Sequence, residues 1–305
     1  MKEFLLNTML RKLEKSDAKE GQKLVSLMTE EEFKTEAAGI PHKKTLLHNM
    51  TQMEYCKAEL FGACILGTLS LPVLKDRVEG RVRFGFYLSE TRLYLVGDVD
   101  QLARLVGRMK ENQFPEELSI PGFFCYLLNS WIDGDVIFLQ KTEDALSALE
   151  EGLLEKIPDH FYKMLIPCRK DLMALHSYYY QMINLGVTIR SNTNQMLSDE
   201  ECLVYGYFSD RAERLHSHVE ALREYVLQIR EMHQTQIQVK QTKTMNLLTV
   251  VSAIFLPLTL LVGWYGMNFI YMPELRWAFG YPGVFVVAVL IVCIEIILFK
   301  KKKLL

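Results

Sequence analysis

A long apolar segment lies near the C-terminal end of the sequence and is followed, after a short loop, by a second one. Between Lys243 and Glu274 there is no Asp, Glu, Lys, Arg or His. About 20 apolar residues suffice to cross a bilayer core of about 30 Å. We therefore predict a first transmembrane helix over residues 245–265, an outer loop over 266–281 and a second transmembrane helix over 282–299. A pair of buried core helices is the alternative, but core helices rarely run this long without charge.

Basic residues predict the orientation of the two spans. Lys240 and Lys243 precede the first span, and the lysine run 300–303, within a basic tail of residues 300–305, follows the second. Because cytoplasmic helix ends carry an excess of Lys and Arg, we expect both termini to be cytoplasmic in a cell inner membrane. Glu295, the one acid of the second span, is close enough to the cytoplasmic end to snorkel, so we interpret it as tolerated rather than functional.

The part before the spans is long enough for a soluble body. We predict a cytosolic α/β domain with following helices over residues 1–195 and a long stalk helix over 196–244. Residues 82–88 and 91–96 alternate partly in polarity around Ser89-Glu90, which indicates a hairpin. Strands are expected over 59–96, and helical periodicity follows over 99–109, 123–131, 143–157 and 161–189.

The stalk helix is predicted to run unbroken into the membrane. Ser198 precedes Asp199 and Glu200 and suits an N-cap. No Pro or Gly occurs between Tyr207 and Leu256. Steps of four and three residues form a heptad seam that would pack against copies of the helix or against a neighbour: Leu215, Val219, Leu222, Val226 and Ile229.

One face of this helix carries a stripe that changes from polar to apolar and back to polar. At helical spacing the stripe contains Thr259, Leu256, Ser252, Leu248, Met245, Thr242, Gln238 and Glu231. If several copies surround an axis, Leu256, Leu248 and Met245 would form an apolar constriction, which gates by dewetting. The same residues could instead face lipid or the second span, and periodicity does not separate the two.

Motifs at the outer end of the first span resemble a known family. Residues 265–269 read Tyr-Gly-Met-Asn-Phe, and residues 271–275 read Tyr-Met-Pro-Glu-Leu. These motifs stand in order after a long helix and before a terminal lysine run. In this the chain is similar to the CorA family of divalent-cation channels, best known for magnesium uptake.

The resemblance implies a funnel-shaped homopentamer in a lipid bilayer, with first spans lining the pore and cytosolic α/β domains that sense magnesium. It implies a selectivity filter at Gly266, Met267 and Asn268, and pore-facing positions that agree with the stripe. Family sensing sites lie between protomers and use acids, for which Asp210 is the candidate; the alternative is an exposed helix carboxylate. Glu274 in the outer loop would raise the local cation concentration.

An amide at the pore entrance suits magnesium for a physical reason. Mg²⁺ sheds its waters reluctantly, so a conducting site should hold the hydrated ion through its water shell. The Asn268 carbonyl accepts hydrogen bonds from polarised water without adding charge, so a ring of such groups could release the ion again. Inward movement of a divalent ion gains about 4 to 5 kcal/mol per 100 mV of inside-negative potential, so no ATP site is required.

Other function classes find less support. The sequence contains no P-loop and no nucleophile elbow. Its seven histidines show no metal-ligand pattern, and His216 and His218 point to different faces of a helix. We therefore expect neither an enzyme nor a cofactor. The net charge of -2 gives no basic field for nucleic acid. A two-span sensor and a zinc transporter of the same superfamily stay open as alternatives.

Overall fold

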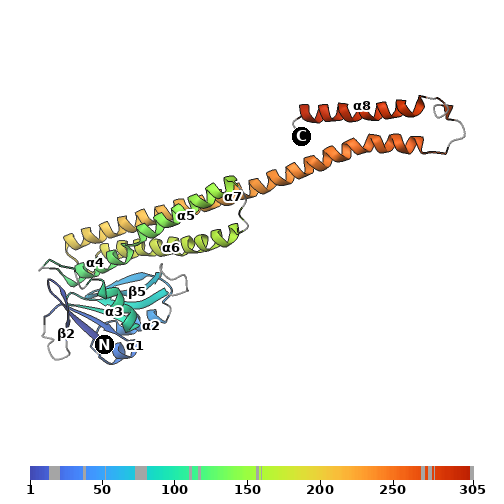
Figure 1. The fold of residues 1–305 in the computed structure, drawn as a ribbon. Coiled ribbons are helices and arrows are strands. Elements are labelled where there is room, and N and C mark those ends of the chain that lie inside the picture. Colours follow the sequence, from blue (N-terminus) through green and yellow to red (C-terminus); the bar gives the residue numbers. More distant parts are fainter. Residues whose placement is uncertain are drawn as a thin grey trace. The chain divides into compact units, whose positions relative to one another are not determined.

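The structure is a computed structural model (Figure 1). It describes residues 1–13, 21–36, 39–51, 53–72, 81–109, 112–115, 118–155, 158, 160–268, 272–273, 277 and 279–302. The chain divides into two compact units. The first comprises Met1–Leu154 and Pro158–Ile229, and the second comprises Glu155–Ile157 and Arg230–Leu305.

A mixed β-sheet forms the base of the first unit. Within the described ranges its strands are β1 (Lys2–Leu6), β2 (Leu10–Leu13), β3 (Leu24–Met28), β4 (Lys57–Phe61), β5 (Cys64–Pro72), β6 (Arg81–Leu88) and β7 (Arg92–Gly97). Their order across the sheet is β2-β1-β3-β7-β6-β5-β4. β3 and β7 pair in parallel, and the other neighbours pair antiparallel. The predicted α/β fold class is therefore confirmed.

The hairpin predicted around Ser89-Glu90 is confirmed as β6 and β7, with Leu88 opposite Leu93. The turn has no Gly or Asn, and Ser89 instead forms hydrogen bonds across it. Its N–H donates to the Arg92 carbonyl at 2.9 Å, and its hydroxyl oxygen accepts from the Arg92 N–H at 3.1 Å. A short polar side chain thus satisfies the backbone where the turn reverses.

The first three strands were not predicted, and placing the start of the strands at residue 59 was wrong. All five residues of β3 are buried, so the strand shows no alternation of polar and apolar positions. It lies inside the sheet between β1 and β7, with both faces covered. A strand of this kind reads as a continuous apolar run, which periodicity alone does not separate from a helix segment.

Helices cover both faces of the sheet (Figure 1). α1 (Glu30–Glu36) and α2 (Lys43–Met50) share one core with β5, β6 and β7, in which Phe33, Leu46 and Met50 are buried. α4 (Ile120–Ile132) covers the other face, where the Phe124 ring lies 4.7 Å from that of Phe86. Between them in sequence, α3 (Val99–Gly107) begins after Asp98, whose carboxylate accepts from two backbone N–H groups of the first turn.

Long helices form the rest of the first unit: α5 (Asp135–Glu155), α6 (Phe161–Arg190) and the first part of α7 (Asp199–Tyr265). All five residues of the predicted heptad seam on α7 are buried. The contacts beside the seam come from the same chain, since Tyr225 donates to Glu150 of α5 and His218 contacts Glu143 of α5. Of the two partners considered for the seam, a neighbouring helix is therefore the one found.

The start of α7 is fixed by a capping box. The Ser198 N–H donates to Glu201 Oε2 at 2.7 Å, and the Glu201 N–H donates to Ser198 Oγ at 3.2 Å. This reciprocal pair satisfies backbone donors that the first helical turn leaves free. The helix is 67 residues long and is unbroken between Tyr207 and Leu256, as the absence of Gly and Pro from that stretch predicted. Pro257 lies inside the helix and has no N–H to donate to the preceding turn.

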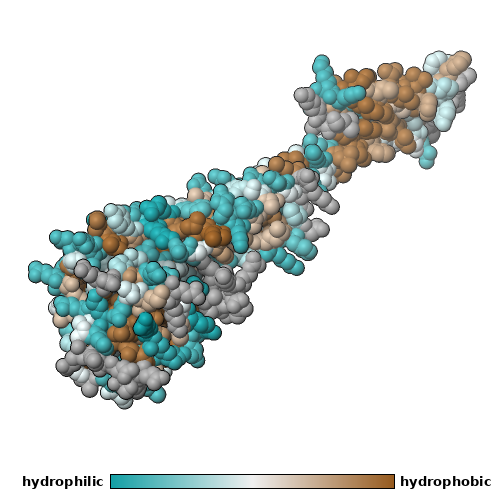
Figure 2. All heavy atoms as spheres, turned by 60° about the vertical axis from the view of Figure 1, so that its left-hand side comes forward, coloured by the Kyte–Doolittle hydropathy of each residue, from teal (hydrophilic) through white to brown (hydrophobic). Residues whose placement is uncertain are grey.

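The second unit contains the last part of α7 and α8 (Gly280–Lys301). Both helices are long and apolar enough to cross a membrane, and their apolar windows are 6% and 0% buried. Figure 2 shows an apolar surface that continues over both helices in this part of the chain. The prediction of two membrane-spanning helices is thus supported by length, composition and exposure together.

Candidate functional site

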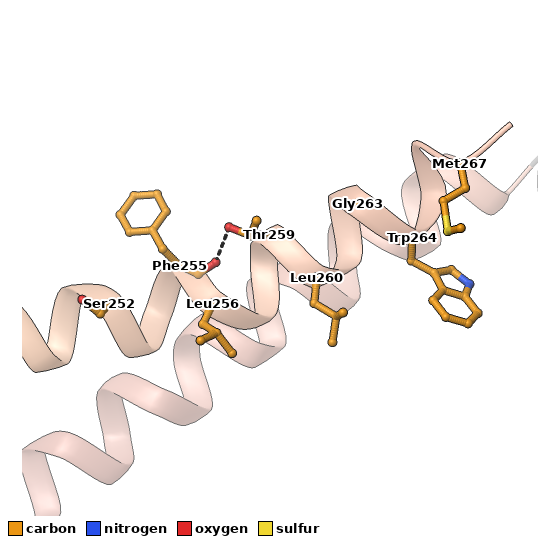
Figure 3. Close-up of a pocket in the computed structure, with 8 residues that line it drawn as sticks. All are labelled: Ser252, Phe255, Leu256, Thr259, Leu260, Gly263, Trp264 and Met267. Atoms are coloured by element: carbon orange, nitrogen blue, oxygen red, sulfur yellow. Dashed lines mark hydrogen bonds between the residues drawn. The ribbon is translucent and has the colours of Figure 1, made fainter.

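The last part of α7 has two faces with different surroundings. Val250 is only 4% exposed, whereas Leu256, six residues later, is 72% exposed. The covered face continues one helical turn after another through half-buried side chains, and α8 runs antiparallel along α7 in this unit (Figures 1 and 3). The residues of reduced exposure are Asn246, Val250, Ala253, Ile254, Pro257, Leu258, Leu261 and Tyr265.

Every residue predicted to line a pore lies on the other, exposed face. This holds for Gln238, Thr242, Met245, Leu248, Ser252, Leu256 and Thr259. The seven positions share one side of the helix because their spacings of three and four residues keep them in line. A single chain thus leaves uncovered the stripe that a ring of copies would enclose. The role of these residues stays a prediction.

An open groove of about 700 Å³ follows the outer part of this face. Figure 3 shows its lining from α7, where the Leu256, Leu260 and Trp264 side chains extend to the same side of the helix. The other lining residues are Ser252, Phe255, Thr259, Gly263 and Met267. Most of the surface is apolar, with two hydroxyl groups among the lining side chains.

Of the two hydroxyl side chains, Thr259 has its proton engaged by the backbone. Thr259 donates its proton to the Phe255 carbonyl at 2.7 Å, a bond drawn in Figure 3. Its oxygen lone pairs therefore remain directed away from the backbone. An oxygen in this state accepts hydrogen bonds from water on a cation and carries no charge of its own.

The Gly-Met-Asn triplet ends α7. The Gly266 N–H donates to the Val262 carbonyl at 2.8 Å, and Asn268 follows the last helical residues with an exposed side chain. A Cβ on Gly266 would lie 3.0 Å from the Val262 carbonyl oxygen, tighter than ordinary contact. This close approach is the reason for a glycine at position 266, because the φ angle of Gly266 does not lie in the left-handed region.

Two predicted residues stand apart from this site. Asp210 is exposed on the part of α7 that belongs to the first unit. No ion pair of Asp210 occurs within the described ranges of this single chain. Glu274 lies outside the described residues, so the prediction for it stands as made.

Glu295 does not snorkel as expected. It lies on the half-buried face of α8, and its Oε2 atom is buried without a hydrogen-bond partner among the described residues. That face also carries Val284, Ala288, Ile291, Val292 and Phe299. One oxygen of the carboxyl group is therefore covered by helix surface.

The histidines provide a second correction. Although their spacing in sequence shows no ligand pattern, the fold brings His176 of α6 to His216 and Glu220 of α7, with their ligating atoms within 4.8 Å of one another. His216 and His218 do point to different faces, because His218 contacts Glu143 of α5.

Comparison with known proteins agrees with this architecture. The family described as "CorA-like Mg2+ transporter protein" matches residues 28–301, nearly the whole chain. The chain belongs to the CorA family. The match includes the α/β part, α7 with its exposed stripe, and α8, so this membership applies to both units of the CorA chain.

Individual relatives resemble this CorA chain over different lengths. The cobalt/magnesium transport protein CorA of Thermotoga maritima is 32% identical over 182 residues, which cover 58% of this chain and 52% of that protein. The chain thus spans about half the length of this curated relative. The CorA magnesium transporter of Methanocaldococcus jannaschii matches in structure with a TM-score of 0.81 at 17% identity, covering 98% of this chain and 96% of that one.

A solved cytoplasmic domain shares the fold of most of the chain. The ZntB cytoplasmic domain from Vibrio parahaemolyticus matches with a TM-score of 0.63 at 8% identity, over 78% of this chain and 98% of that domain. At such identities the likeness shows the fold alone. The family assignment therefore does not choose between ions.

Proposed function

We propose that the chain is a divalent-cation channel that takes up magnesium down its electrochemical gradient, with cobalt or nickel as further possible cargo. The observation that carries the proposal is the two-faced outer half of α7. One face is covered by α8, and the opposite face leaves the stripe from Gln238 to Thr259 exposed beside the Gly-Met-Asn end. A homopentamer, with first spans inside and second spans outside, would enclose that stripe.

Selection takes place at the outer end of the helix. Asn268 is exposed there and carries a neutral amide whose oxygen accepts hydrogen bonds from the water shell of a cation. Mg²⁺ keeps its waters tightly, so a ring of amides together with the Gly266 and Met267 backbone would hold the hydrated ion loosely. Glu274 would concentrate cations in front of this ring.

The closed state depends on the apolar part of the stripe. Met245, Leu248 and Leu256 are all exposed on one face of α7, and rings of such side chains around a narrow lumen expel water. Thr242 and Gln238 follow on the inner side and would form a hydrated vestibule. A hydrated ion crosses only when the constriction widens enough to admit water.

Regulation would act through acidic groups between protomers. Bound magnesium would screen the acidic groups that face one another between protomers, so the assembly stays symmetric and closed. When magnesium is lost, repulsion between these groups would loosen the contacts between protomers and water would enter the constriction. Asp210, exposed on α7, is our candidate for one such acid. Replacing Asp210 with Lys should remove the protection from protease that magnesium gives, and unchanged protection would exclude this residue.

We place the protein in the cell inner membrane with both termini in the cytoplasm. The proposed organisation is a cytosolic part over residues 1–195, a stalk over 196–244, the pore helix over 245–265, an outer loop over 266–281, an outer helix over 282–299 and a basic tail. Lysines on the inner ends of both spans support this orientation.

Zinc is the second candidate ion. The fold shared with the ZntB cytoplasmic domain leaves this alternative open. The outer-loop sequence Met-Pro-Glu-Leu at residues 272–275 favours magnesium and cobalt instead. A two-span sensor is the alternative outside transport, and it would not need Asn268.

Uptake into liposomes tests these alternatives together. Purified full-length protein is reconstituted, an inside-negative potential is imposed, and magnesium entry is measured with zinc, cobalt or nickel as competitors. We expect entry that depends on the potential and is lost in Asn268→Ala. Flux that survives Asn268→Ala would overturn the proposed filter. Preferential entry of zinc would make zinc, and not magnesium, the transported ion. The absence of flux for every divalent ion would favour a sensor.

A further inference from the structure

A cluster of metal-ligating side chains joins α6 and α7 inside the first unit. His216 and Glu220 lie one turn apart on α7, and His176 faces them from α6. The His176 and His216 rings are 4.5 Å apart between centroids, and His176 Nε2 lies 3.5 Å from Glu220 Oε1. Residues from two different helices thus point their nitrogen and oxygen atoms at one small space.

The state of His216 requires an explanation. Its Nε2 atom is buried and has no hydrogen-bond partner within the described part of the chain. A buried polar atom without a hydrogen-bond partner destabilises the folded state. A metal ion held between the two rings and the carboxylate would give this nitrogen the partner that it lacks.

The surroundings keep the imidazole in the form that binds metal. Burial, and then the neighbouring His176, lower the pKa of His216, with Arg223 acting in the same direction and Glu220 and Glu213 opposing. A neutral imidazole offers a nitrogen lone pair, whereas a protonated one does not.

The ligand set identifies the class of ion. Mg²⁺ prefers oxygen ligands and retains most of its waters, so two imidazoles suit it poorly. Two imidazoles and one carboxylate are typical of Zn²⁺, Co²⁺ and Ni²⁺. Metal–ligand bonds of about 2.0 to 2.2 Å bring tetrahedral ligands to roughly 3.4 Å from one another. The present span of 4.8 Å needs only a small movement, which the exposed Glu220 side chain permits.

We propose that His176, His216 and Glu220 bind a transition-metal dication, with zinc as the expected occupant, and that this ion fastens α6 to α7. Three protein ligands leave a fourth position for water. The site lies in the first unit and shares no residue with the stripe from Gln238 to Thr259 or with the Gly-Met-Asn triplet of the second. The inference therefore goes beyond the proposed transport function, and a protein that conducts no ions could still bind metal here.

Cobalt provides a direct probe, because Co²⁺ bound by nitrogen and oxygen ligands in a tetrahedral site absorbs visible light. Untagged full-length protein is titrated with Co²⁺ in excess magnesium, which occupies oxygen-only sites, and Zn²⁺ is then added. We expect one Co²⁺ per chain that Zn²⁺ displaces, and a rise in Tm with Zn²⁺. Both signals should be absent in His216→Ala and His176→Ala.

Two further variants make the result decisive. Glu220→Gln keeps the size of the side chain and should weaken affinity by at least the roughly 10- to 100-fold that loss of an outer-sphere partner costs. His218→Ala is the matched control, because His218 also pairs with a glutamate, Glu143 at 3.3 Å, but has no third ligand nearby among the described residues. Equal Co²⁺ spectra in wild type, His176→Ala and His216→Ala, or an equal loss in His218→Ala, would overturn the proposal.

Discussion

The Tyr179 hydroxyl donates a hydrogen bond of 2.7 Å to a carboxylate oxygen of Asp135, joining α6 to α5 within the first unit. Both side chains are buried. Burial raises the pKa of Asp135 to about 6, although the Tyr179 hydrogen bond and the charges of Arg211 and Arg108 oppose the shift. A carboxyl group with an ordinary pKa of 3.8 thus retains its proton in the folded chain well above that pH.

This shift predicts how stability depends on pH. Between about pH 4 and 6 the folded chain holds a proton at Asp135 that the unfolded chain has released, so the free energy of unfolding falls as pH rises through this window. Asp135→Asn keeps an acceptor for Tyr179 and cannot ionise. We expect the variant to exceed wild type in stability at pH 7 by at most roughly 3 kcal/mol, with no difference near pH 4.

Thermal unfolding of full-length protein in detergent, from pH 4 to pH 8, measures the effect as a difference between the two Tm curves. Asp144→Asn on the same helix is the control, because Asp144 is exposed. Its curve should run parallel to wild type. A Tm of Asp135→Asn below wild type at every pH would contradict the assignment.

A glycine allows α6 and α7 to approach closely. A Cβ added at Gly186 would lie 2.3 Å from Ser209 Oγ and 2.9 Å from Phe208 Cδ1. We expect Gly186→Ala to lower the free energy of unfolding by roughly 1 to 3 kcal/mol through overpacking. Gly152→Ala on α5 meets nothing within 4 Å and should raise stability by up to about 1 kcal/mol. Equal Tm values for the two variants would show that the helices separate easily at this point.

Two adjacent leucines test which face of α7 encloses water. Leu247 is 60% exposed and Leu248 is 61% exposed, but only Leu248 lies on the proposed pore face. We expect Leu248→Ser to make the closed channel leak, because a hydroxyl weakens the apolar barrier. Leu247→Ser should leave resting flux unchanged. The leak is measured as magnesium entry into liposomes that contain either magnesium-free buffer or a high internal magnesium concentration. A leak in Leu247→Ser alone would mean that the face of α7 carrying Leu247, and not that carrying Leu248, encloses the water.

A negative charge at the filter should raise the affinity for magnesium and lower the rate of transport. Asn268→Asp replaces a neutral acceptor by a carboxylate, which holds a dication more firmly. We therefore expect a lower half-saturating magnesium concentration and a lower maximal uptake rate. Asn268→Gln retains the carboxamide and serves as the control, with affinity closer to wild type. A faster maximal rate in Asn268→Asp would contradict a filter that depends on loose binding.

Features encoded by neighbouring residues could be predicted from the sequence. The spans follow from a stretch without charge, and α7 follows from a capping box at Ser198 and an apolar seam. The alignment of the stripe follows from helical spacing, whereas its exposure depends on where α8 packs and was left open. The interactions that decide the spans, the start of α7 and the alignment of the stripe lie within a few residues along the chain.

Features that depend on distant partners could not be predicted in this way. β3 lies between β1 and β7 and is buried because helices cover both faces of the sheet, and its five residues do not encode those partners. His176 meets His216 through the alignment of α6 with α7, which no sequence spacing encodes. One local signal was available, since His216 and Glu220 stand four residues apart on one helix face.

Because β7 pairs in parallel with β3 and is the last described strand in sequence, all of these strands are available once Gly97 has been translated. Residues 98–244 are then still to be translated before the first hydrophobic span. At roughly 5 to 20 residues per second this interval lasts on the order of ten seconds, whereas α/β sheets form in milliseconds to seconds. The nascent sheet therefore has time to fold before the chain presents a segment that the membrane insertion machinery can recognise.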